Sequence, residues 1–314
     1  MKRQAISATA ALFAIAMAAY GAWVYEGQWG EYGAGPGEFL RTYGVAVAAN
    51  GNVYAADWGN RRVQYFTSTG SFLGGWYGFI YCGSVDVAPN GNVYAISYDD
   101  CRILYFTPTG SRLGSWGSRG SENGEFLFPS GVDVAPNGNV YVCDRLNDRI
   151  QYFTSTGSFL GKWGEYGLRE GQFDRPGHAC VAPNGNVYVS DTGNDRIQYF
   201  TAAGSSLGKW GRTGSGEGRF SGPQGIDISP AGEVFVAEAG NDRIQYFTLD
   251  GSFLGKFGAP GPRNGEFDKP SDVAYTAADI VYVADTVNSR IQYFRWSEPA
   301  VYPTSLGRVK ALFK

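Results

Sequence analysis

A chain of 314 residues, 43% apolar and 16% aromatic, is long enough for one large domain or two ordinary ones with a packed core. Its formal net charge of −3 gives no electrostatic reason to bind nucleic acid, because such binding normally replaces phosphate counterions with basic side chains. We therefore expect no nucleic-acid partner. The 46 glycines recur at fixed places between apolar runs, so they indicate turns and not a flexible linker.

The first segment, residues 1–21, has the features of a secretory signal peptide. Lys2 and Arg3 precede a charge-free stretch rich in small apolar residues, and residues 16–18 (AMA) offer a small-residue cleavage site. The alternative is an uncleaved membrane anchor, since residues 5–24 have the length needed to cross a bilayer. In the first case we expect a secreted or periplasmic protein, and in the second a membrane-anchored protein that faces outside.

One short motif recurs along the rest of the chain. Taking the valine of NVYAAD as origin, the spacings are 40 residues once and 47 residues four times, at Val53, Val93, Val140, Val187, Val234 and Val281. A period of this size, made of short strand-like segments, is typical of a β-propeller, in which each repeat is a small antiparallel sheet packed against its neighbours. We therefore predict an all-β fold, a six-bladed β-propeller of four-stranded antiparallel blades.

The fourth repeat illustrates the four strands of one blade, here named a to d in chain order. Strand-like segments separated by polar turns are found at residues 177–181, 186–190, 197–201 and 206–210. The last repeat ends at RIQYFRW without a strand d, whereas residues 22–30 (AWVYEGQWG) resemble a strand d with no blade before it. We therefore predict that this N-terminal strand completes the sixth blade and closes the ring, which removes exposed sheet edges.

The repeat pattern GVDVAPNGNVYVxDxxNDRIQYFTxxGSFLGKWG followed by GEFxxP resembles the NHL-repeat family of six-bladed propellers. The predicted organisation is a signal peptide (1–21), an NHL-type propeller (22–296) and a C-terminal tail (297–314). The resemblance implies the fold together with a range of roles, including protein-binding platforms, extracellular sensor domains and a few enzymes. A shared fold is not a shared activity.

An acid at the end of strand b and an arginine five residues later recur in five repeats. The pairs are Asp57 with Arg62, Asp144 with Arg149, Asp191 with Arg196, Glu238 with Arg243, and Asp285 with Arg290. The second repeat has Ser97 before Arg102. Because a reaction needs one site and not five, we interpret these residues as structural ion pairs that brace the b–c turns.

Two other residue types also recur and are interpreted as structural. Tryptophans close to the end of strand d are expected to pack between adjacent blades, at Trp29, Trp76, Trp116, Trp163 and Trp210. Aspartates at one position of strand a are expected to bond backbone or hydroxyl groups between blades, at Asp86, Asp133 and Asp227.

The repeat is broken in blades one to three, in loops that we expect on the same face. The residue after the acidic position is small in blades four to six, but it is Trp58, Tyr98 and Arg145 in blades one to three. Aromatic residues and arginine are enriched where partners dock. The alternative is tolerated drift in a surface loop.

The connection between blades one and two is shortened to GGWYGFIYCGS, which brings Tyr77, Phe79 and Tyr81 near Trp58 and Tyr98. A shortened loop is expected to leave a notch, and aromatic side chains in it would suit a sugar ring or an extended peptide. We predict ligand binding by these residues and Arg145. The alternative is that the aromatics only fill the space left by the deletion.

The cysteines and the single histidine are the remaining candidates. Cys82 and Cys101 lie in loops expected to meet, so they are predicted to form a disulfide. His178 is the only histidine, which excludes sites with several histidine ligands, and no close CxxC spacing indicates zinc. We expect neither a metal nor a cofactor. If the protein is an enzyme, the candidate general base is His178 with Asp144 or Asp191 near the central opening.

These observations lead to one preferred function and two alternatives. The preferred function is a monomeric, non-enzymatic module that binds a protein, peptide or glycan on the face of the b–c turns. The first alternative is a propeller lyase or hydrolase, because resemblance to streptogramin lyases and gluconolactonase-like proteins implies a site at the central opening. The second is a structural protein of an envelope complex. A membrane contact is expected only if the N-terminal segment stays uncleaved.

Overall fold

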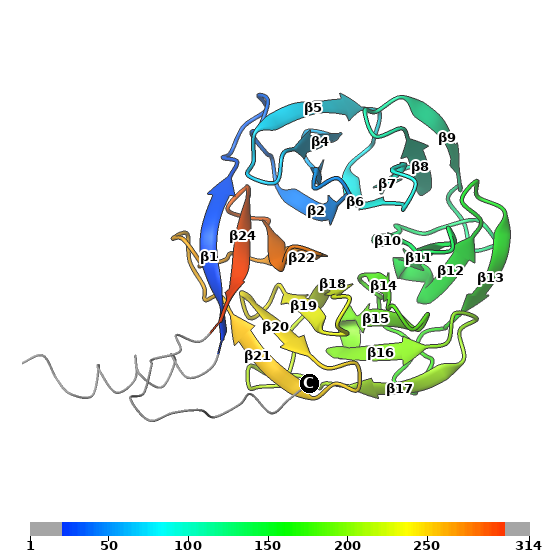
Figure 1. The fold of residues 1–314 in the computed structure, drawn as a ribbon. Helices are drawn as coiled ribbons and strands as arrows, with labels where there is room; N and C mark the ends of the chain where they lie inside the picture. Colours follow the sequence, from blue (N-terminus) through cyan, green and yellow to red (C-terminus); the bar gives the residue numbers. More distant parts are fainter. Residues whose placement is uncertain (1–20, 299–314) are drawn as a thin grey trace, which may run out of the picture.

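The computed structural model describes residues 21–298, and Figure 1 shows six small sheets arranged around a central opening. Each sheet has four antiparallel strands, with strand a nearest the axis and strand d outermost. The predicted six-bladed propeller is therefore confirmed. Residues 1–20 and 299–314, which hold most of the predicted signal peptide (1–21) and of the predicted tail (297–314), lie outside the described residues. No helix within residues 21–298 is long and apolar enough to span a membrane.

The strands of each blade follow one another in the chain. Blade one contains β2 (Thr42–Val47), β3 (Val53–Asp57), β4 (Arg62–Phe66) and β5 (Phe72–Tyr77). Blade two contains β6 (Cys82–Val87), β7 (Val93–Ser97), β8 (Arg102–Phe106) and β9 (Arg112–Trp116). Blade three contains β10 (Gly131–Val134), β11 (Val140–Asp144), β12 (Arg149–Phe153) and β13 (Phe159–Trp163), with the short 3-10 turn η1 (Arg145–Asn147) between β11 and β12.

Blade four contains β14 (Ala179–Val181), β15 (Val187–Asp191), β16 (Arg196–Phe200) and β17 (Ser206–Trp210), with η2 (Thr192–Asn194) between β15 and β16. Blade five contains β18 (Pro223–Ile228), β19 (Val234–Glu238), β20 (Arg243–Phe247) and β21 (Phe253–Phe257). Blade six contains β22 (Pro270–Thr276), β23 (Ile280–Asp285), β24 (Arg290–Ser297) and β1 (Ala22–Trp29).

Ring closure joins the two ends of the described chain. Strand β1 pairs antiparallel with β24, from Ala22 opposite Ser297 to Trp29 opposite Ile291. In Figure 1 the blue β1 lies beside the red β24. The predicted closure by an N-terminal strand is confirmed, so folding of the sixth blade depends on contacts between residues far apart in sequence.

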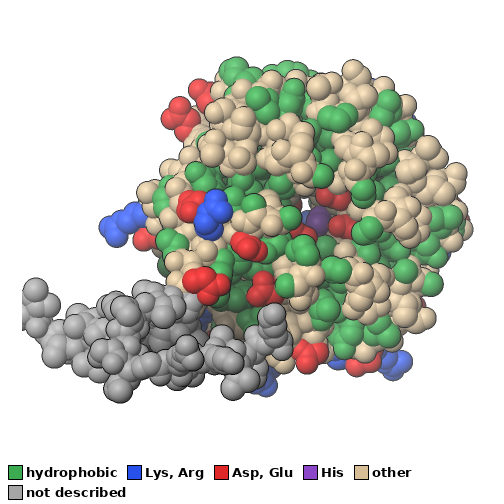
Figure 2. Space-filling model, in the orientation of Figure 1, with side chains coloured by type: hydrophobic (Ala, Val, Ile, Leu, Met, Phe, Trp, Pro, Cys, Tyr) green, Lys and Arg blue, Asp and Glu red, His purple; other side chains and the backbone are tan. Residues whose placement is uncertain are grey.

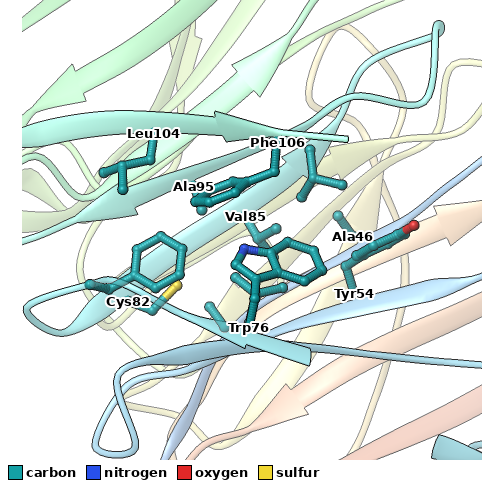
Figure 3. Close-up of a cluster of buried hydrophobic side chains, with 12 residues drawn as sticks. Ala46, Tyr54, Trp76, Cys82, Val85, Ala95, Leu104 and Phe106 are labelled. Carbon is teal, nitrogen blue, oxygen red and sulfur yellow. The ribbon is translucent and has the colours of Figure 1, made fainter. Parts of the chain in front are cut away.

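Aromatic rings fill the space between adjacent blades. The tryptophan near the end of strand d packs against the phenylalanine that ends strand c of the next blade, with ring centroids 5.4–6.1 Å apart in Trp29–Phe66, Trp76–Phe106, Trp116–Phe153, Trp163–Phe200 and Trp210–Phe247. Figure 3 shows one such cluster, in which Trp76 and Phe106 lie among buried residues of blades one and two. The predicted packing role of these tryptophans is confirmed.

A buried arginine of strand c holds the loop that enters its blade. Arg196 donates from Nε to Asp191 (2.6 Å) and from Nη2 to the main-chain oxygens of Arg169 (2.8 Å) and Gln172 (2.7 Å). Gln198 also donates to Asp191, at 3.0 Å. We call this arrangement the arginine socket. It recurs around Arg62, Arg149, Arg196, Arg243 and Arg290, whose ion pairs measure 2.6–2.8 Å.

Aspartates that are buried or partly buried link the inner strands of neighbouring blades. Asp86 accepts a hydrogen bond from the N–H of Val134, and Asp133 accepts one from Val181. The other two bonds run from Tyr275 N–H to Asp227 (2.6 Å) and from Val45 N–H to Asp272 (3.0 Å). The expected bonding of strand-a aspartates to backbone groups between blades is confirmed. We call Asp86, Asp133, Asp227 and Asp272 the axial carboxyls.

The contact of tryptophan with the next blade can be tested at Gly204, which lies in the c–d turn of blade four. Its φ is +90°, and an added Cβ would lie 2.5 Å from the ring of Trp163. Gly185, in the a–b turn of the same blade, has φ +84° and open space around its missing Cβ. We expect Gly185→Ala to cost about 1–2 kcal/mol for backbone strain, and Gly204→Ala to cost about 1–3 kcal/mol more for overpacking.

Denaturant unfolding of the two variants measures this difference directly. Equal losses of unfolding free energy in both would show that the close approach of Trp163 does not limit packing between blades.

Stability is expected to fall as the pH rises, because the axial carboxyls are buried. Burial raises the pKa of Asp86 and Asp227 to about 6 and that of Asp272 to about 8. In the unfolded chain an aspartate has a pKa of about 3.9. The folded state therefore binds more protons than the unfolded state above pH 4, so the free energy of unfolding decreases with pH. The part of the decrease that Asp272 causes should end once the pH passes about 8.

Unfolding titrations of the wild type and of Asp272→Asn between pH 5 and pH 9 test this account. The variant should lose the part of the pH dependence that lies around pH 8. An unchanged slope in the variant would contradict the assignment.

Candidate functional site

A hollow of about 550 Å³, including its solvent-open part, lies on the propeller axis at the face of the b–c turns. One or two residues from the start of every inner strand line it, namely Tyr43, Gly83, Ser84, Ser130, Gly177, His178, Gln224, Gly225, Ser271 and Asp272. Residues that follow strand b add Trp58, Tyr98, Arg145 and Thr192. We call this space the axial hollow. It brings together three of the predicted ligand-binding residues, Trp58, Tyr98 and Arg145.

Blades one and two form an aromatic side of the axial hollow. The ring centroid of Trp58 lies 4.8 Å from that of Tyr43 and 4.9 Å from that of Tyr98. Tyr81 stacks on Trp58 at 5.2 Å, although it does not itself line the hollow. The guanidinium of Arg61 covers Tyr81 at 5.1 Å. Aromatic contacts of this kind hold the rings in fixed positions.

Tyr43 is a site residue that the sequence analysis missed. A register shift between Thr42 and Gly44 lets strand β2 place its side chain at the axis. Alignment of the inner strands offers a signal, because the other blades carry glycine, serine or glutamine at this position.

Two predicted ligand residues lie elsewhere. Phe79 is only 5% exposed and packs against Phe106 at 5.6 Å, in the cluster of Figure 3. The prediction that Phe79 binds a ligand is therefore wrong. Phe79 occupies the position that Phe126 has in the loop before blade three, so the shortened loop keeps its core aromatic. Tyr77 is 67% exposed, and its hydroxyl accepts a hydrogen bond from Arg62 (3.3 Å) outside the axial hollow.

The predicted disulfide between Cys82 and Cys101 is not formed, since both residues are free and buried. Cys82 packs in the cluster between blades one and two, whereas Cys101 packs in the cluster between blades two and three. The two thiols therefore lie on opposite faces of the blade-two sheet. The Cys101 sulfur accepts a hydrogen bond from the N–H of Phe128 (3.4 Å).

His178 lies at the floor of the axial hollow, and it also lines the inner channel below, beside Asp86, Asp133 and Asp227. Figure 2 shows the histidine, in purple, inside the central opening with acidic side chains beside it. Both imidazole nitrogens are buried and have no hydrogen-bond partner among the described residues. Burial lowers the pKa of His178, while the charges of Asp86 and Asp227 act in the opposite direction. A neutral imidazole thus faces the hollow.

The structure does not pair His178 with Asp144 or Asp191, the carboxylates expected for a general base. Asp144 is bonded to Arg149 (2.7 Å), and Asp191 to Arg196 (2.6 Å), within their arginine sockets. Both carboxylates are fully buried. The predicted catalytic combination is therefore wrong, because each acid already serves a loop. Within residues 21–298, no group of three or more His, Cys, Asp or Glu side chains is placed to hold a metal ion.

Comparison with solved structures finds other propellers of low sequence identity. A protein of unknown function from Bacteroides thetaiotaomicron is 17% identical, with a TM-score of 0.68, over 88% of this chain and 76% of that one. A streptogramin B lyase is 13% identical, with a TM-score of 0.61, over 88% of this chain and 98% of that one. At these identities the likeness shows the fold alone.

A third structure, a catalytically inactive virginiamycin B lyase from Staphylococcus aureus solved with quinupristin, is 16% identical with a TM-score of 0.57. It covers 81% of this chain and 84% of that one. No curated protein matches the sequence.

The NHL repeat model matches three segments, residues 126–153, 173–200 and 267–294. Each match runs from the buried phenylalanine of the entering loop to the buried phenylalanine of strand c. The chain is therefore a six-bladed β-propeller that contains NHL repeats at these three positions.

Proposed function

We propose that this propeller is a non-enzymatic binding module that takes a protein, peptide or glycan ligand in the axial hollow. The observation that carries the proposal is the unequal wall of the hollow. Blades one and two contribute Tyr43, Trp58 and Tyr98, whereas the opposite side is built from small and polar residues. A ring of six similar blades needs no such asymmetry for its own stability.

Much of the axial hollow is open to solvent, and the space that it encloses is small, about 50 Å³. We therefore expect one small ligand group to enter the hollow while the rest of the ligand contacts its rim. Aromatic side chains supply large apolar contact area at low conformational cost, and they are frequent binding hot spots. Arg145 on the adjoining wall adds a donor for a carboxylate or hydroxyl group.

The polar side of the axial hollow retains acceptor capacity. The hydroxyl of Thr192 donates to the main-chain oxygen of Pro223 (2.7 Å), and that of Ser130 donates to Pro176 (2.8 Å). Each hydroxyl oxygen keeps lone pairs for a donor on the ligand. The side-chain amide of Gln224 makes no hydrogen bond within residues 21–298, so it is available as both donor and acceptor.

Two buried polar atoms at the floor of the axial hollow lack a hydrogen-bond partner within residues 21–298. Buried polar atoms are normally paired, and an unpaired one is costly. The two nitrogens of His178 are the side-chain atoms at this floor that lack a partner. Both nitrogens are inaccessible from the hollow, so a ligand group or a bridging water would supply a partner only after a shift of the ring.

The compartment and assembly state belong to the same proposal. The N-terminal segment supports a secreted or periplasmic location, with a membrane-anchored form as the alternative. A monomer accords with a ring that closes within one chain.

Replacing the aromatic side by the residue type of other blades should abolish binding. Thr192 and Thr286 occupy the equivalent positions in blades four and six, so we expect Trp58→Thr/Tyr98→Thr to fold. The best hit from a glycan and peptide array should bind the variant at least about tenfold more weakly in calorimetry, because truncating an aromatic anchor costs about 2 kcal/mol or more.

The matched control is Tyr32→Thr/Tyr166→Thr, which removes two aromatic residues, 77% and 72% exposed, from loops outside the axial hollow. It should bind like the wild type. Equal binding by the hollow variant, or no array hit for the wild type, would sink the proposal. Turnover by the wild type that is lost in His178→Ala would instead favour the lyase or hydrolase alternative.

A further inference from the structure

Blade two lacks the arginine socket but keeps its arginine. The acid at the end of strand b is replaced by Ser97, and the glutamine of strand c is replaced by Leu104. The five socket arginines are only 5–7% exposed. Arg102 is exposed, and its side chain makes no hydrogen bond or ion pair within residues 21–298.

The loop that would cover Arg102 is also missing. Before blade three, the loop between Trp116 and Gly131 offers main-chain oxygens of Ser121 (2.6 Å) and Glu122 (2.9 Å) to Arg149. Before blade two, only residues 78–81 connect the strands. Tyr77 and Ile80 are left 67% and 41% exposed. Arg102 is therefore uncovered at the place where a longer loop covers the corresponding arginine of the other blades. We call this uncovered surface around Arg102 and Ile80 the notch.

We propose that this notch binds an extended acidic peptide segment of a partner protein. A carboxylate of the peptide takes the place of the missing acid on Arg102, and its main-chain carbonyls take the place of the missing loop. Arginine favours such partners because its planar guanidinium donates to a carboxylate through two parallel N–H groups. Ile80, whose N–H donates to Ser97 opposite Arg102 in the sheet, provides apolar contact for a side chain of the peptide.

The other charged residues near the notch leave Arg102 as the group that would bind a carboxylate of the peptide. Asp99 and Asp100 lie in the neighbouring turn, and Asp100 accepts a hydrogen bond from Ser97 (3.0 Å). Arg119 is held over the ring of Phe128 (4.4 Å) and donates to the main-chain oxygen of Asp99 (3.0 Å). No broad positive field surrounds the notch, so the peptide carboxylate must contact Arg102 directly.

The notch is separate from the axial hollow, because Arg102, Tyr77 and Ile80 do not line the hollow. The inference therefore stands independently of the proposed function. It follows from comparing one blade with the other five, and not from the aromatic side of the axial hollow.

The test uses two fluorescein-labelled octapeptides, one of alternating glycine and glutamate and one of alternating glycine and glutamine, measured by fluorescence anisotropy. The wild type should bind the acidic peptide at least tenfold more tightly than the neutral one. Arg102→Gln should lower the affinity for the acidic peptide at least tenfold. Because this residue is exposed and unpartnered, the variant should fold like the wild type.

A second variant restores an internal partner for Arg102. In blade one, Asp57 accepts a hydrogen bond from the N–H of Leu40 (2.9 Å). In blade two, Ser97 accepts the equivalent hydrogen bond from the N–H of Ile80 (2.8 Å). In Ser97→Asp the new carboxylate should therefore keep this hydrogen bond and pair with Arg102. The affinity for the acidic peptide should then fall at least tenfold. Arg112→Gln, an exposed arginine of β9 in the same blade, is the matched control and should bind normally.

Full binding by Arg102→Gln, or no binding of the acidic peptide to the wild type at millimolar concentration, would overturn the inference. Trp58→Thr/Tyr98→Thr should bind the acidic peptide with the affinity of the wild type. Arg102→Gln should bind the ligand of the axial hollow with the affinity of the wild type. Failure of one proposal is thus distinguishable from failure of the other.

Discussion

The arginine socket is the interaction on which the rest of the structure depends. A guanidinium buried with its carboxylate is stable only when the remaining donors and acceptors are also paired, since an unpaired buried charge is costly. The main-chain oxygens of the entering loop supply those partners in five blades. Each loop is thereby fixed in place, and with it the entrance to each inner strand.

Because the loops that lead into the inner strands are held in place, a simple repeat can carry a specific site. The residues that line the axial hollow stand at or just before the start of the inner strands, or directly after strand b, next to the sockets. Their backbone positions are set by the repeat, so side chains can change there without loss of the fold. Blades one to three use this freedom for Tyr43, Trp58, Tyr98 and Arg145, and blade two has given up the socket itself.

The sequence was sufficient for the architecture because every blade repeats the same physical requirements. The 47-residue period, the tryptophans and the acid–arginine pairs each appear several times, so one unusual residue does not hide the pattern. The convergence of Trp58 and Tyr98 also followed from their shared place after strand b. Their contact with Tyr81 agrees with the expected proximity of the shortened loop.

The remaining site features depend on which face of a strand a side chain occupies, and the repeat pattern does not reveal this in irregular segments. Tyr43 reaches the axis through a local register shift. Phe79 looked available because its loop is short, yet its position belongs to the core. Cys82 and Cys101 are near in the chain's topology but separated by the sheet of their own blade.

The most direct test of the central claim is a crystal structure of the protein with its strongest array hit. The account predicts ligand density in the axial hollow, in contact with Trp58 and Tyr98 and with a polar group directed at His178. Density on the opposite face or along the outer strands, with the axial hollow free of ligand, would contradict it.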